Sequence, residues 1–384
     1  MRKKGGVVEN PFVFSKEVGG EDFCNRKKEI KELSGFVRSS QNVMMFSQRR
    51  FGKTSLIKEV LKRAEKEGIL TVYVDLYAVL SEQQLVKSYS EAVSNSLLSK
   101  TEKAFITAGK LFKQLQPVLT HDDEGKPVFK VDVDLAKTIP LLEDVLDSVN
   151  RTVEKKRKKA VIVLDEFQQI GQFKDDRVEK ILRTHIQKHQ NISYFFMGSK
   201  KHLIIDMFNN TNRPFYKLAA PYPLKKIEKL ELVEFLLEKF KKAERDIDKE
   251  IASSIVEICE HHPYYVQYLC YIIWENTKPG ETIDNEKVTE GINVLLDWTS
   301  PTYEATWGLL TTVQKKVLET IARKAEEERM FSADVINRFG LGTASALQRS
   351  LKSLIDKDLI DKEDDNYTII DLFLKKWINK KLIR

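Results

Sequence analysis

The chain has 384 residues, of which 42% are hydrophobic and 32% are charged, so it is long enough for two or three globular domains with buried cores. Its net charge of +7 permits contact with nucleic acid or an acidic surface but does not argue strongly for either. Three widely spaced cysteines, with no secretory leader and no long apolar run, argue against a disulfide scaffold and a membrane protein, and we expect a cytoplasmic one.

Residues 42–57 read as a buried strand, a cationic loop and a helix, which is the arrangement of a phosphate-binding loop. The amides at a helix N-terminus are unpaired and the helix dipole makes that end partially positive, so both favour a bound phosphate. The loop follows the pattern G-x-x-x-x-G-K-[ST] at Gly52-Lys53-Thr54, with Ser47 in place of the first glycine. We therefore predict that a nucleoside triphosphate is bound by Ser47, Gln48, Arg49, Arg50, Phe51, Gly52, Lys53, Thr54 and Ser55.

Lys53 and Thr54 have distinct expected roles, because the ammonium can reach the β- and γ-phosphates and the hydroxyl can hold a magnesium ion that they share. Residues 160–166 form an apolar run that ends in Asp165 and Glu166, which predicts a buried strand with two carboxylates at its C-terminal end. We expect Asp165 in the outer shell of the metal and Glu166 to polarise the water that attacks the γ-phosphate. The alternatives are an ordinary strand-to-helix turn and a buried strand with a polar cap, and the joint occurrence of the two motifs favours the nucleotide site.

Three further residues are candidates for contact with the γ-phosphate. Residues 191–199 predict another buried strand, whose end would place Ser199 beside the phosphate. Arg183, on a helix predicted over residues 175–188, and Arg213 are candidate stabilisers of the developing charge, in cis or from a neighbouring subunit. The sequence does not choose between the two arginines.

Other segments provide candidates for contact with the adenine. Phe23 and Arg26 lie at helical spacing before the first strand, where they would cover the base or, equally, only dock a helix on an apolar face. The helical region 224–278 predicts a lid over the nucleotide. Pro263 is at the start of its last helix, where we expect it to contact the adenine. Residues 110–134 read as an inserted hairpin.

Six short motifs lie between residues 23 and 265: Phe23-x-x-Arg26-x-x-Glu29, Gln48-Arg-Arg-Phe-Gly-Lys-Thr-Ser-Leu56, Leu164-Asp-Glu166, Gly198-Ser199, Pro214-Phe-Tyr216 and His262-Pro-Tyr-Tyr265. Together they resemble the archaeal-type ATPases of the STAND branch of the AAA+ superfamily. The resemblance implies a P-loop core, a helical lid and a C-terminal winged helix, which bind ATP and change state with it. The sequence departs from the family pattern at Ser47 and at Lys217-Leu218, where an arginine often occurs.

We therefore expect an α/β protein with a parallel-sheet P-loop core in residues 1–222, a helical lid in residues 223–300 and a winged helix in residues 301–384. The last region predicts a hairpin wing after three helices, over residues 312–322, 332–339 and 343–356. In the third helix, leucines would face inward while Gln348, Arg349 and Lys352 share the outer face, which is the face that would read a DNA groove.

The predicted wing argues against simple DNA binding, because its tip, residues 361–365, carries four carboxylates against one lysine and phosphates repel carboxylates. The first hypothesis is therefore a magnesium-dependent, ATP-hydrolysing switch whose winged helix engages a protein client or the lid itself. The second is an ATP-dependent DNA-binding regulator. The third, a nucleotide-binding module without hydrolysis, depends on Ser47 alone. The sequence does not identify the client, the trigger or whether a homo-oligomer forms.

Overall fold

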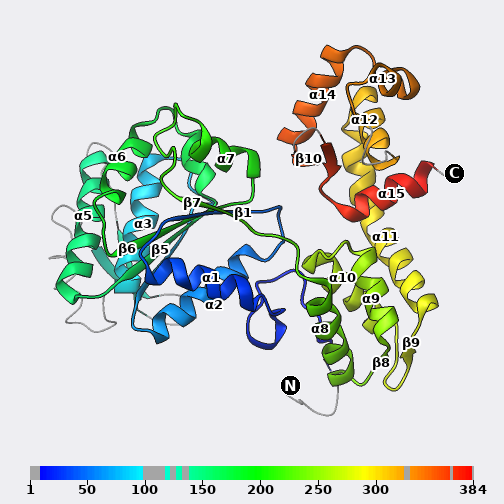
Figure 1. Ribbon diagram of the computed structural model, residues 1–384, viewed down its shortest axis with the longest axis horizontal. Helices are drawn as coiled ribbons and strands as arrows, with labels where there is room; N and C mark the ends of the chain where they lie inside the picture. Colours follow the sequence, from blue (N-terminus) through cyan, green and yellow to red (C-terminus); the bar gives the residue numbers. More distant parts are fainter. Residues whose placement is uncertain are drawn as a thin grey trace. The chain divides into compact units, whose positions relative to one another are not determined.

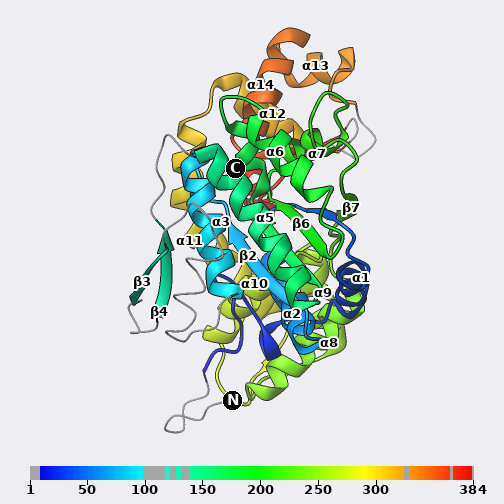
Figure 2. The ribbon, with the colours of Figure 1, turned by 90° about the vertical axis from the view of Figure 1, so that its left-hand side faces the viewer.

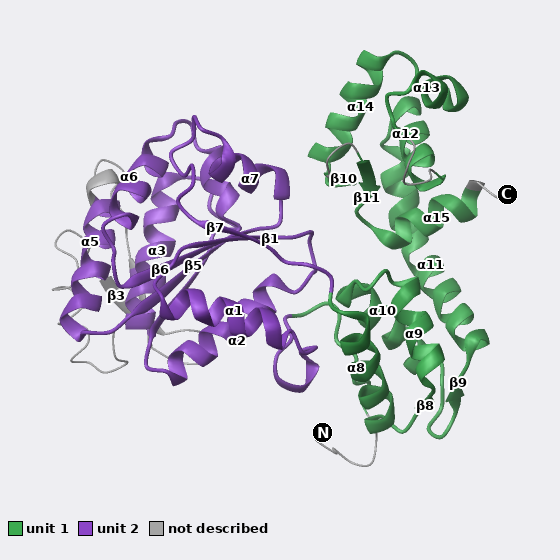
Figure 3. Ribbon diagram, in the orientation of Figure 1, with its two compact units in different colours: residues 1–16, 227–384 green, residues 17–226 purple. Residues whose placement is uncertain are grey.

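The computed structural model describes residues 9–97, 117–121, 127–131, 138–323, 329–363 and 366–382. The chain divides into two compact units: the one we call the first is Glu17–Lys226, drawn in purple as unit 2 in Figure 3, and the second joins Ile227–Arg384 to Met1–Lys16, drawn in green as unit 1. The chain therefore passes between the units twice, after Lys16 and after Lys226. None of the described helices is long and apolar enough to cross a lipid bilayer.

The first unit is built on a five-stranded parallel sheet in the order β2-β5-β6-β1-β7. Its strands are β1 (Val43–Phe46), β2 (Leu70–Asp75), β5 (Ala160–Asp165), β6 (Ile192–Gly198) and β7 (Ala220–Pro223). Helices pack on both faces of the sheet (Figure 1, Figure 2). One face is covered by α1 (Lys27–Arg38) and α2 (Lys53–Lys66), and the other by α3 (Glu82–Leu97), α5 (Thr138–Lys156), α6 (Arg177–Ile186) and α7 (Lys201–Asn209). The predicted α/β parallel-sheet core is confirmed.

The interior strand β5 shows why this sheet could be predicted. Val161 and Val163 pack toward α1 and α2, whereas Ile162 and Leu164 pack toward the opposite helix layer. Side chains alternate across a strand, so a strand that is covered on both faces must be apolar throughout. The polar residue that ends such a run, here Asp165, then marks the carboxyl end of the strand.

The edge strand β7 was not predicted because it contains Pro221 and Pro223. Proline has no amide proton, so a strand that contains it is tolerated at the edge of a sheet, which is where β7 lies beside β1.

The strand order also places β6 between β1 and β5. The end of β6, followed by Ser199, therefore lies between the predicted phosphate loop, which follows β1, and the strand that carries Asp165.

A separate antiparallel pair of strands lies between α3 and α5 in the sequence. Strand β3 (Pro117–His121) pairs with β4 (Pro127–Val131), with Leu119 opposite Phe129. The pair falls within the segment where the sequence predicts a hairpin. The connecting residues 122–126 lie outside the described residues.

The second unit begins with a group of helices and two short paired strands: α8 (Lys229–Lys242), β8 (Asp246–Ile247), α9 (Lys249–Ile258), α10 (Pro263–Glu275), β9 (Thr282–Ile283) and α11 (Asn285–Gly308). Within the region that the sequence predicts to be helical, α9 begins at Lys249. The reason is local, because Asp248 caps this helix by accepting a hydrogen bond from the Ile251 amide at 2.7 Å.

Residues 10–14, which we call the N-terminal strap, pack on these helices. Phe12 contacts Phe240 at 4.7 Å between ring centroids, and Phe14 stacks on Tyr268 at 4.2 Å. The Val13 amide donates to Gln267 at 3.1 Å. The strap therefore belongs to the helical unit, although the sheet core follows it directly in the sequence.

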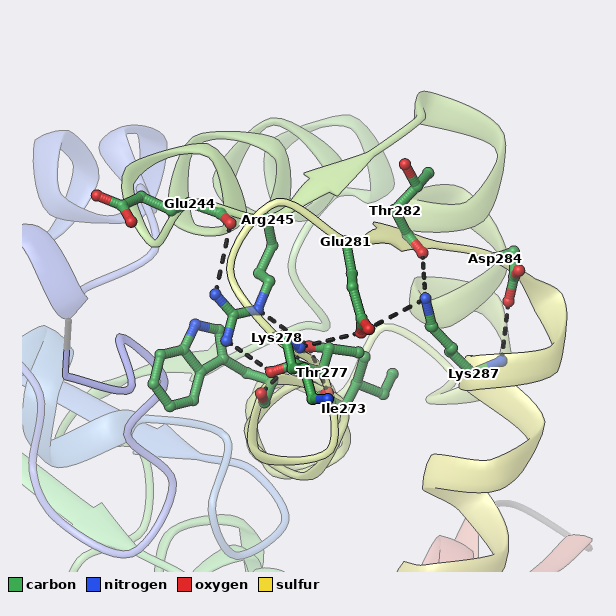
Figure 4. Close-up of polar contacts among 10 residues, drawn as sticks. Glu244, Arg245, Ile273, Thr277, Lys278, Glu281, Thr282, Asp284 and Lys287 are labelled. Atoms are coloured by element: carbon green, nitrogen blue, oxygen red, sulfur yellow. Dashed lines mark hydrogen bonds and ion pairs between the residues drawn. The ribbon is translucent and has the colours of Figure 1, made fainter. Parts of the chain in front are cut away.

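A buried arginine joins the ends of two helices in this unit (Figure 4). Arg245 donates to the Thr277 carbonyl at 2.6 Å, to the Thr277 hydroxyl at 3.1 Å and to the Ala243 carbonyl at 3.2 Å. Its guanidinium also lies over the ring of Trp274, 4.8 Å from the centroid. The C-terminal ends of α8 and α10 are thereby held together.

The winged helix completes the second unit with α12 (Thr312–Arg323), α13 (Ala333–Phe339), α14 (Ala344–Asp356), β10 (Ile360–Glu363), β11 (Asn366–Ile369) and α15 (Leu372–Leu382). Leu347, Leu351 and Leu354 of α14 are buried, as their spacing predicts. Strands β10 and β11 pair antiparallel and form the wing. Two residues of its tip, 364–365, lie outside the described residues.

Hydrogen bonds join the winged helix to the preceding helices. The Tyr303 hydroxyl of α11 donates to Asp371 at 3.1 Å, and the Leu372 amide donates to the Tyr265 hydroxyl of α10 at 3.3 Å. The Trp377 indole of α15 donates to Ser300 at 2.9 Å. The start of α15 is therefore held by both α10 and α11.

Candidate functional site

The predicted phosphate loop connects the C-terminal end of β1 to the N-terminus of α2. Gly52, the residue before α2, has φ 84° and ψ 24°, a left-handed conformation that residues with a side chain rarely adopt. Arg50 is also left-handed, with φ 63°. These two residues turn the chain sharply into α2, whose first amides have no partners within the helix.

The Lys53 side chain is folded into this loop, and only 7% of the residue is exposed. Its ammonium donates to the Ser47 carbonyl at 3.2 Å, to the Ser47 hydroxyl at 3.3 Å and to the Gln48 carbonyl at 3.2 Å. Burial lowers the pKa of Lys53 to about 8, and the negative charges of Glu166 and Asp165 oppose this shift. The lysine thus lies among loop oxygens, within electrostatic reach of both predicted carboxylates.

Ser47 occupies the position of the first glycine in the loop pattern. The backbone of Ser47 is not left-handed, unlike that of Arg50 and Gly52, so a side chain is accommodated at this position without backbone strain. Its hydroxyl donates to the Gln48 carbonyl at 3.0 Å and accepts from Lys53. Serine is therefore compatible with the loop and gives the lysine an additional oxygen partner.

A hydrogen bond links the start of α2 to the end of β5. The Thr54 hydroxyl donates to Asp165 Oδ2 at 3.1 Å. The same oxygen accepts from the Tyr73 hydroxyl of β2 at 2.5 Å, and Oδ1 accepts from the Glu166 amide at 2.9 Å. Burial raises the pKa of Asp165, which is 5% exposed. Hydroxyl and carboxylate oxygens are the ligands that magnesium prefers, so the Thr54–Asp165 pair fits this ion.

The Glu166 carboxylate is held by groups from two other elements. Its Oε2 accepts from the Ser199 hydroxyl at 2.9 Å, from the Ser199 amide at 3.3 Å, and from the Gln168 side-chain amide. Gln168 belongs to the short 3₁₀ helix Phe167–Gln172 and is 1% exposed. Glu166 itself is left-handed, with φ 53°, and starts the turn that brings Gln168 back toward it. The ends of β5 and β6 are thus connected through this carboxylate.

Arg26 contacts the backbone of the predicted phosphate loop. It is 2% exposed, and its guanidinium donates to the Phe51 carbonyl at 3.0 Å, to the Lys225 carbonyl at 3.0 Å and to Glu29 at 2.9 Å. These contacts support the loop backbone at Phe51. Contact between Arg26 and an adenine ring stays a prediction.

A model of a family described as an ATPase domain predominantly from Archaea matches residues 23–269, which is more than half of the chain. The chain belongs to this family. A probable winged helix domain matches residues 301–380, where the structure has the helices and wing described above. The phosphate loop, Asp165, Glu166 and Ser199 all lie within the part that matches the archaeal ATPase domain.

Similar archaeal proteins described as ATP-binding are consistent with this family assignment. An ATP-binding protein of Methanocaldococcus jannaschii is 24% identical over 268 residues, which are 61% of this chain and 67% of that protein. Matches to two other archaeal proteins cover 55% and 56% of those proteins' own lengths.

Solved structures show the same fold. The Walker-type ATPase of Pyrococcus abyssi aligns with a TM-score of 0.66 and 17% identity, over 96% of this chain and 99% of that one. The ORC2 protein of Aeropyrum pernix, in its ADPNP and ADP complexes, aligns with a TM-score of 0.55 and 13% identity, over 100% of this chain and 99% of that one. At such identities these similarities establish the fold alone.

Within this archaeal ATPase domain, the two candidate charge stabilisers make internal contacts. Arg183 donates to the carbonyls of Pro214 and Tyr216, and Arg213 pairs with Glu179 at 2.8 Å. Both contacts tie α6 to the segment that follows α7. A role for either arginine at a phosphate stays a prediction.

The remaining candidates lie in the second unit. Pro263 is the first residue of α10, where the chain needs no amide donor. Gln348, Arg349 and Lys352 are exposed on α14. Contact of Pro263 with a base, and of the α14 residues with DNA, stay predictions.

Sequence analysis of this archaeal ATPase domain missed Tyr73 and Gln168. Tyr73 lies in an apolar strand, where an aromatic residue is usually part of the core, and only the strand order shows that its hydroxyl faces Asp165. Gln168 follows Glu166 by two residues, and this short separation from a predicted catalytic carboxylate was the signal available in the sequence, whereas its burial and its contact with Glu166 are seen only in the structure.

Proposed function

We propose that the chain binds ATP together with Mg²⁺ at the phosphate loop and hydrolyses the bond to the γ-phosphate. The observation that carries the proposal is the Thr54–Asp165 hydrogen bond, because it joins the phosphate loop to the carboxylate strand at the point where a shared metal ion would lie. The family description and the ATP-binding relatives support the choice of nucleotide. Membership of the STAND branch, indicated by the motif resemblance, is part of the same proposal.

Each site residue has one role in this mechanism. Lys53 leaves its loop oxygens to bind the β- and γ-phosphates, together with the amides at the start of α2. Thr54 and Asp165 hold Mg²⁺, which when bound neutralises charge on the two phosphates. Glu166 orients the attacking water and accepts its proton, and Ser199, which already contacts Glu166, lies at the γ-phosphate.

Two substitutions test the site. In Glu166→Gln we expect ADPNP affinity within about twofold of wild type and ATP turnover lowered by ~10²-fold or more, as loss of a general base usually causes. In Lys53→Ala we expect tight ADPNP binding to be lost, because the phosphates lose a direct cationic partner. Titration calorimetry and phosphate release measure these effects, with Glu67→Gln on the exposed end of α2 as the control. Unchanged turnover in Glu166→Gln would refute the assigned base, and unchanged affinity in Lys53→Ala would refute the phosphate loop.

We further propose that the nucleotide state is passed to the winged helix, as in a molecular switch that acts on a protein client. The contacts of Tyr265 and Tyr303 with the start of α15 support this coupling, because movement of α10 or α11 would carry the winged helix with it. Asp371 is central to these contacts, since it accepts from Tyr303 and from the Phe373 amide at the beginning of α15.

A DNA-binding regulator is the second candidate, favoured by the exposed row Gln348, Arg349 and Lys352 on α14. If it is correct, Arg349→Ala with Lys352→Ala should weaken duplex binding and reduce its salt dependence. A wild-type protein without salt-dependent affinity for any duplex would exclude this candidate.

A further inference from the structure

Tyr73 makes a contact to the predicted metal site that neither the family description nor the relatives account for. Its hydroxyl donates to Asp165 Oδ2 at 2.5 Å, the shortest of the three hydrogen bonds described above for that carboxylate. The Thr54 hydroxyl shares this oxygen, at 3.1 Å. Tyr73 of β2 and Thr54 of α2 therefore meet at one buried carboxylate at the end of β5.

The sheet register places Tyr73 to make this contact. Tyr73 of β2 is opposite Val163 of β5, so Asp165, two residues further along β5, is its diagonal neighbour on the same face. The Tyr73 ring packs with the layer that includes α2, and the Lys58 ammonium of that helix is 5.4 Å from the ring centroid. The tyrosine is thus held between the strand and α2 with its hydroxyl directed at Asp165.

The shared oxygen determines how the Thr54 hydroxyl is oriented. A hydroxyl has one proton, and when Thr54 donates it to Asp165 its lone pairs point away from the carboxylate and are available to a cation. Asp165 can orient Thr54 only if its own position is fixed. The Tyr73 hydroxyl and the Glu166 amide fix its two oxygens separately. Tyr73 therefore acts on Thr54 through Asp165.

We propose that Tyr73 is a positioning residue for the magnesium site, which sets the affinity for the metal ion and not the affinity for the nucleotide. This inference depends on the proposed function, because it concerns the same Thr54–Asp165 pair. Groups that hydrogen-bond to metal-site residues from outside typically change metal affinity by about 10- to 100-fold when they are removed. A tyrosine that only fills space would lose nothing in metal affinity when its hydroxyl alone is removed.

The variant Tyr73→Phe keeps the ring and removes the hydroxyl. Tyr222→Phe is the matched control, because Tyr222 also lies in this sheet and donates to a carboxylate, Glu32, at 2.7 Å. For each full-length protein, ADPNP affinity is measured by calorimetry in EDTA and then at a series of MgCl₂ concentrations. Binding of Mn²⁺ to the protein–ADPNP complex, followed by electron paramagnetic resonance, gives a direct second measurement, and thermal unfolding verifies the fold.

We expect the three proteins to bind ADPNP equally in EDTA, within about twofold. In Tyr73→Phe alone, the MgCl₂ concentration for half-maximal tightening should rise ~10-fold or more, with a parallel loss of Mn²⁺ affinity. This inference is wrong, and the proposed function still stands, if Tyr73→Phe needs the same MgCl₂ concentration as wild type for half-maximal tightening. The same holds if Tyr73→Phe loses ADPNP affinity equally in EDTA and in MgCl₂. If the ADPNP affinity of the wild-type protein does not change with the MgCl₂ concentration, both the proposed metal site and this inference are wrong.

Discussion

Replacement of Gly198 by alanine tests how closely the end of β6 is packed against the groups that hold Glu166. A Cβ atom at Gly198 would lie 2.5 Å from Gln168 Oε1 and 3.0 Å from Ile204 Cδ1, so at least one of these side chains must move. Gln168 is fully buried and its amide donates to Glu166, so displacement of Gln168 also displaces the predicted base. Overpacking of this kind costs about 1–3 kcal/mol.

For a unit of this size, that cost corresponds to a fall in Tm of roughly 2–12 °C. We expect Gly198→Ala to show this fall together with slower ATP turnover, while ADPNP affinity stays within about twofold of wild type, because the phosphate loop is not touched. Differential scanning calorimetry and single-turnover hydrolysis are the assays. Gly35→Ala is the control, since a Cβ there meets nothing within 4 Å and alanine should stabilise α1 by about 0.5–1 kcal/mol.

A double mutant tests whether the Gln168 side chain is responsible for the cost of Gly198→Ala. If Gln168 is the obstruction, then in a Gln168→Ala background the substitution Gly198→Ala should cost at least ~1 kcal/mol less than in wild type, because residues in contact are energetically coupled. Equal costs in both backgrounds would show that Gln168 is not the side chain displaced. A Gly198→Ala protein with wild-type Tm and turnover would refute the reasoning altogether.

Two further predictions concern stability. Burial lowers the pKa of His189 to about 4, so the stability that its neutral form contributes is fully present above the unfolded pKa of about 6.5 and is lost as the pH falls through the folded value. Between these two pH values, the free energy of unfolding of His189→Gln should therefore fall by about 3 kcal/mol less than that of wild type, and an equal pH dependence in the two proteins would contradict this prediction. Arg245→Met should destabilise the second unit by about 2–4 kcal/mol, because buried carbonyls lose their charged donor. The four tryptophans of the chain all lie in that unit, so urea unfolding followed by tryptophan fluorescence measures the loss, and the exposed Lys278→Met should stay within about 0.5 kcal/mol of wild type.

The elements that sequence analysis predicted correctly are those whose pattern follows from burial. Strands β1, β5 and β6 are largely apolar because helices cover both of their faces, and α14 repeats leucine at helical spacing because one side of it is buried. The location of Asp165 and Glu166 at a strand end followed from the same argument. Their contact with Thr54 and Ser199 depended in addition on the strand order, which no local pattern contains.

Features set by contacts distant in the sequence were missed. Strand β7 looks like a loop because prolines interrupt it, and it exists only as the partner of β1. The long helix α11 contains Pro301 and has polar residues around much of its surface, so its apolar spacing is weak. Arg26 and Arg245 are buried with hydrogen bonds to backbone carbonyls, whereas arginine in a sequence normally indicates an exposed side chain.

The N-terminal strap affects the order in which the protein can be completed during synthesis. Val13 and Gln267, which are hydrogen-bonded, are separated by 254 residues, so the strap leaves the ribosome long before the helices that receive it. Closing so long a segment is slow and costs chain entropy, which makes docking of Phe12 and Phe14 a late event in folding. Until then the aromatic surface of α10 is uncovered, and exposed apolar surface of this kind makes an incompletely folded chain prone to aggregation.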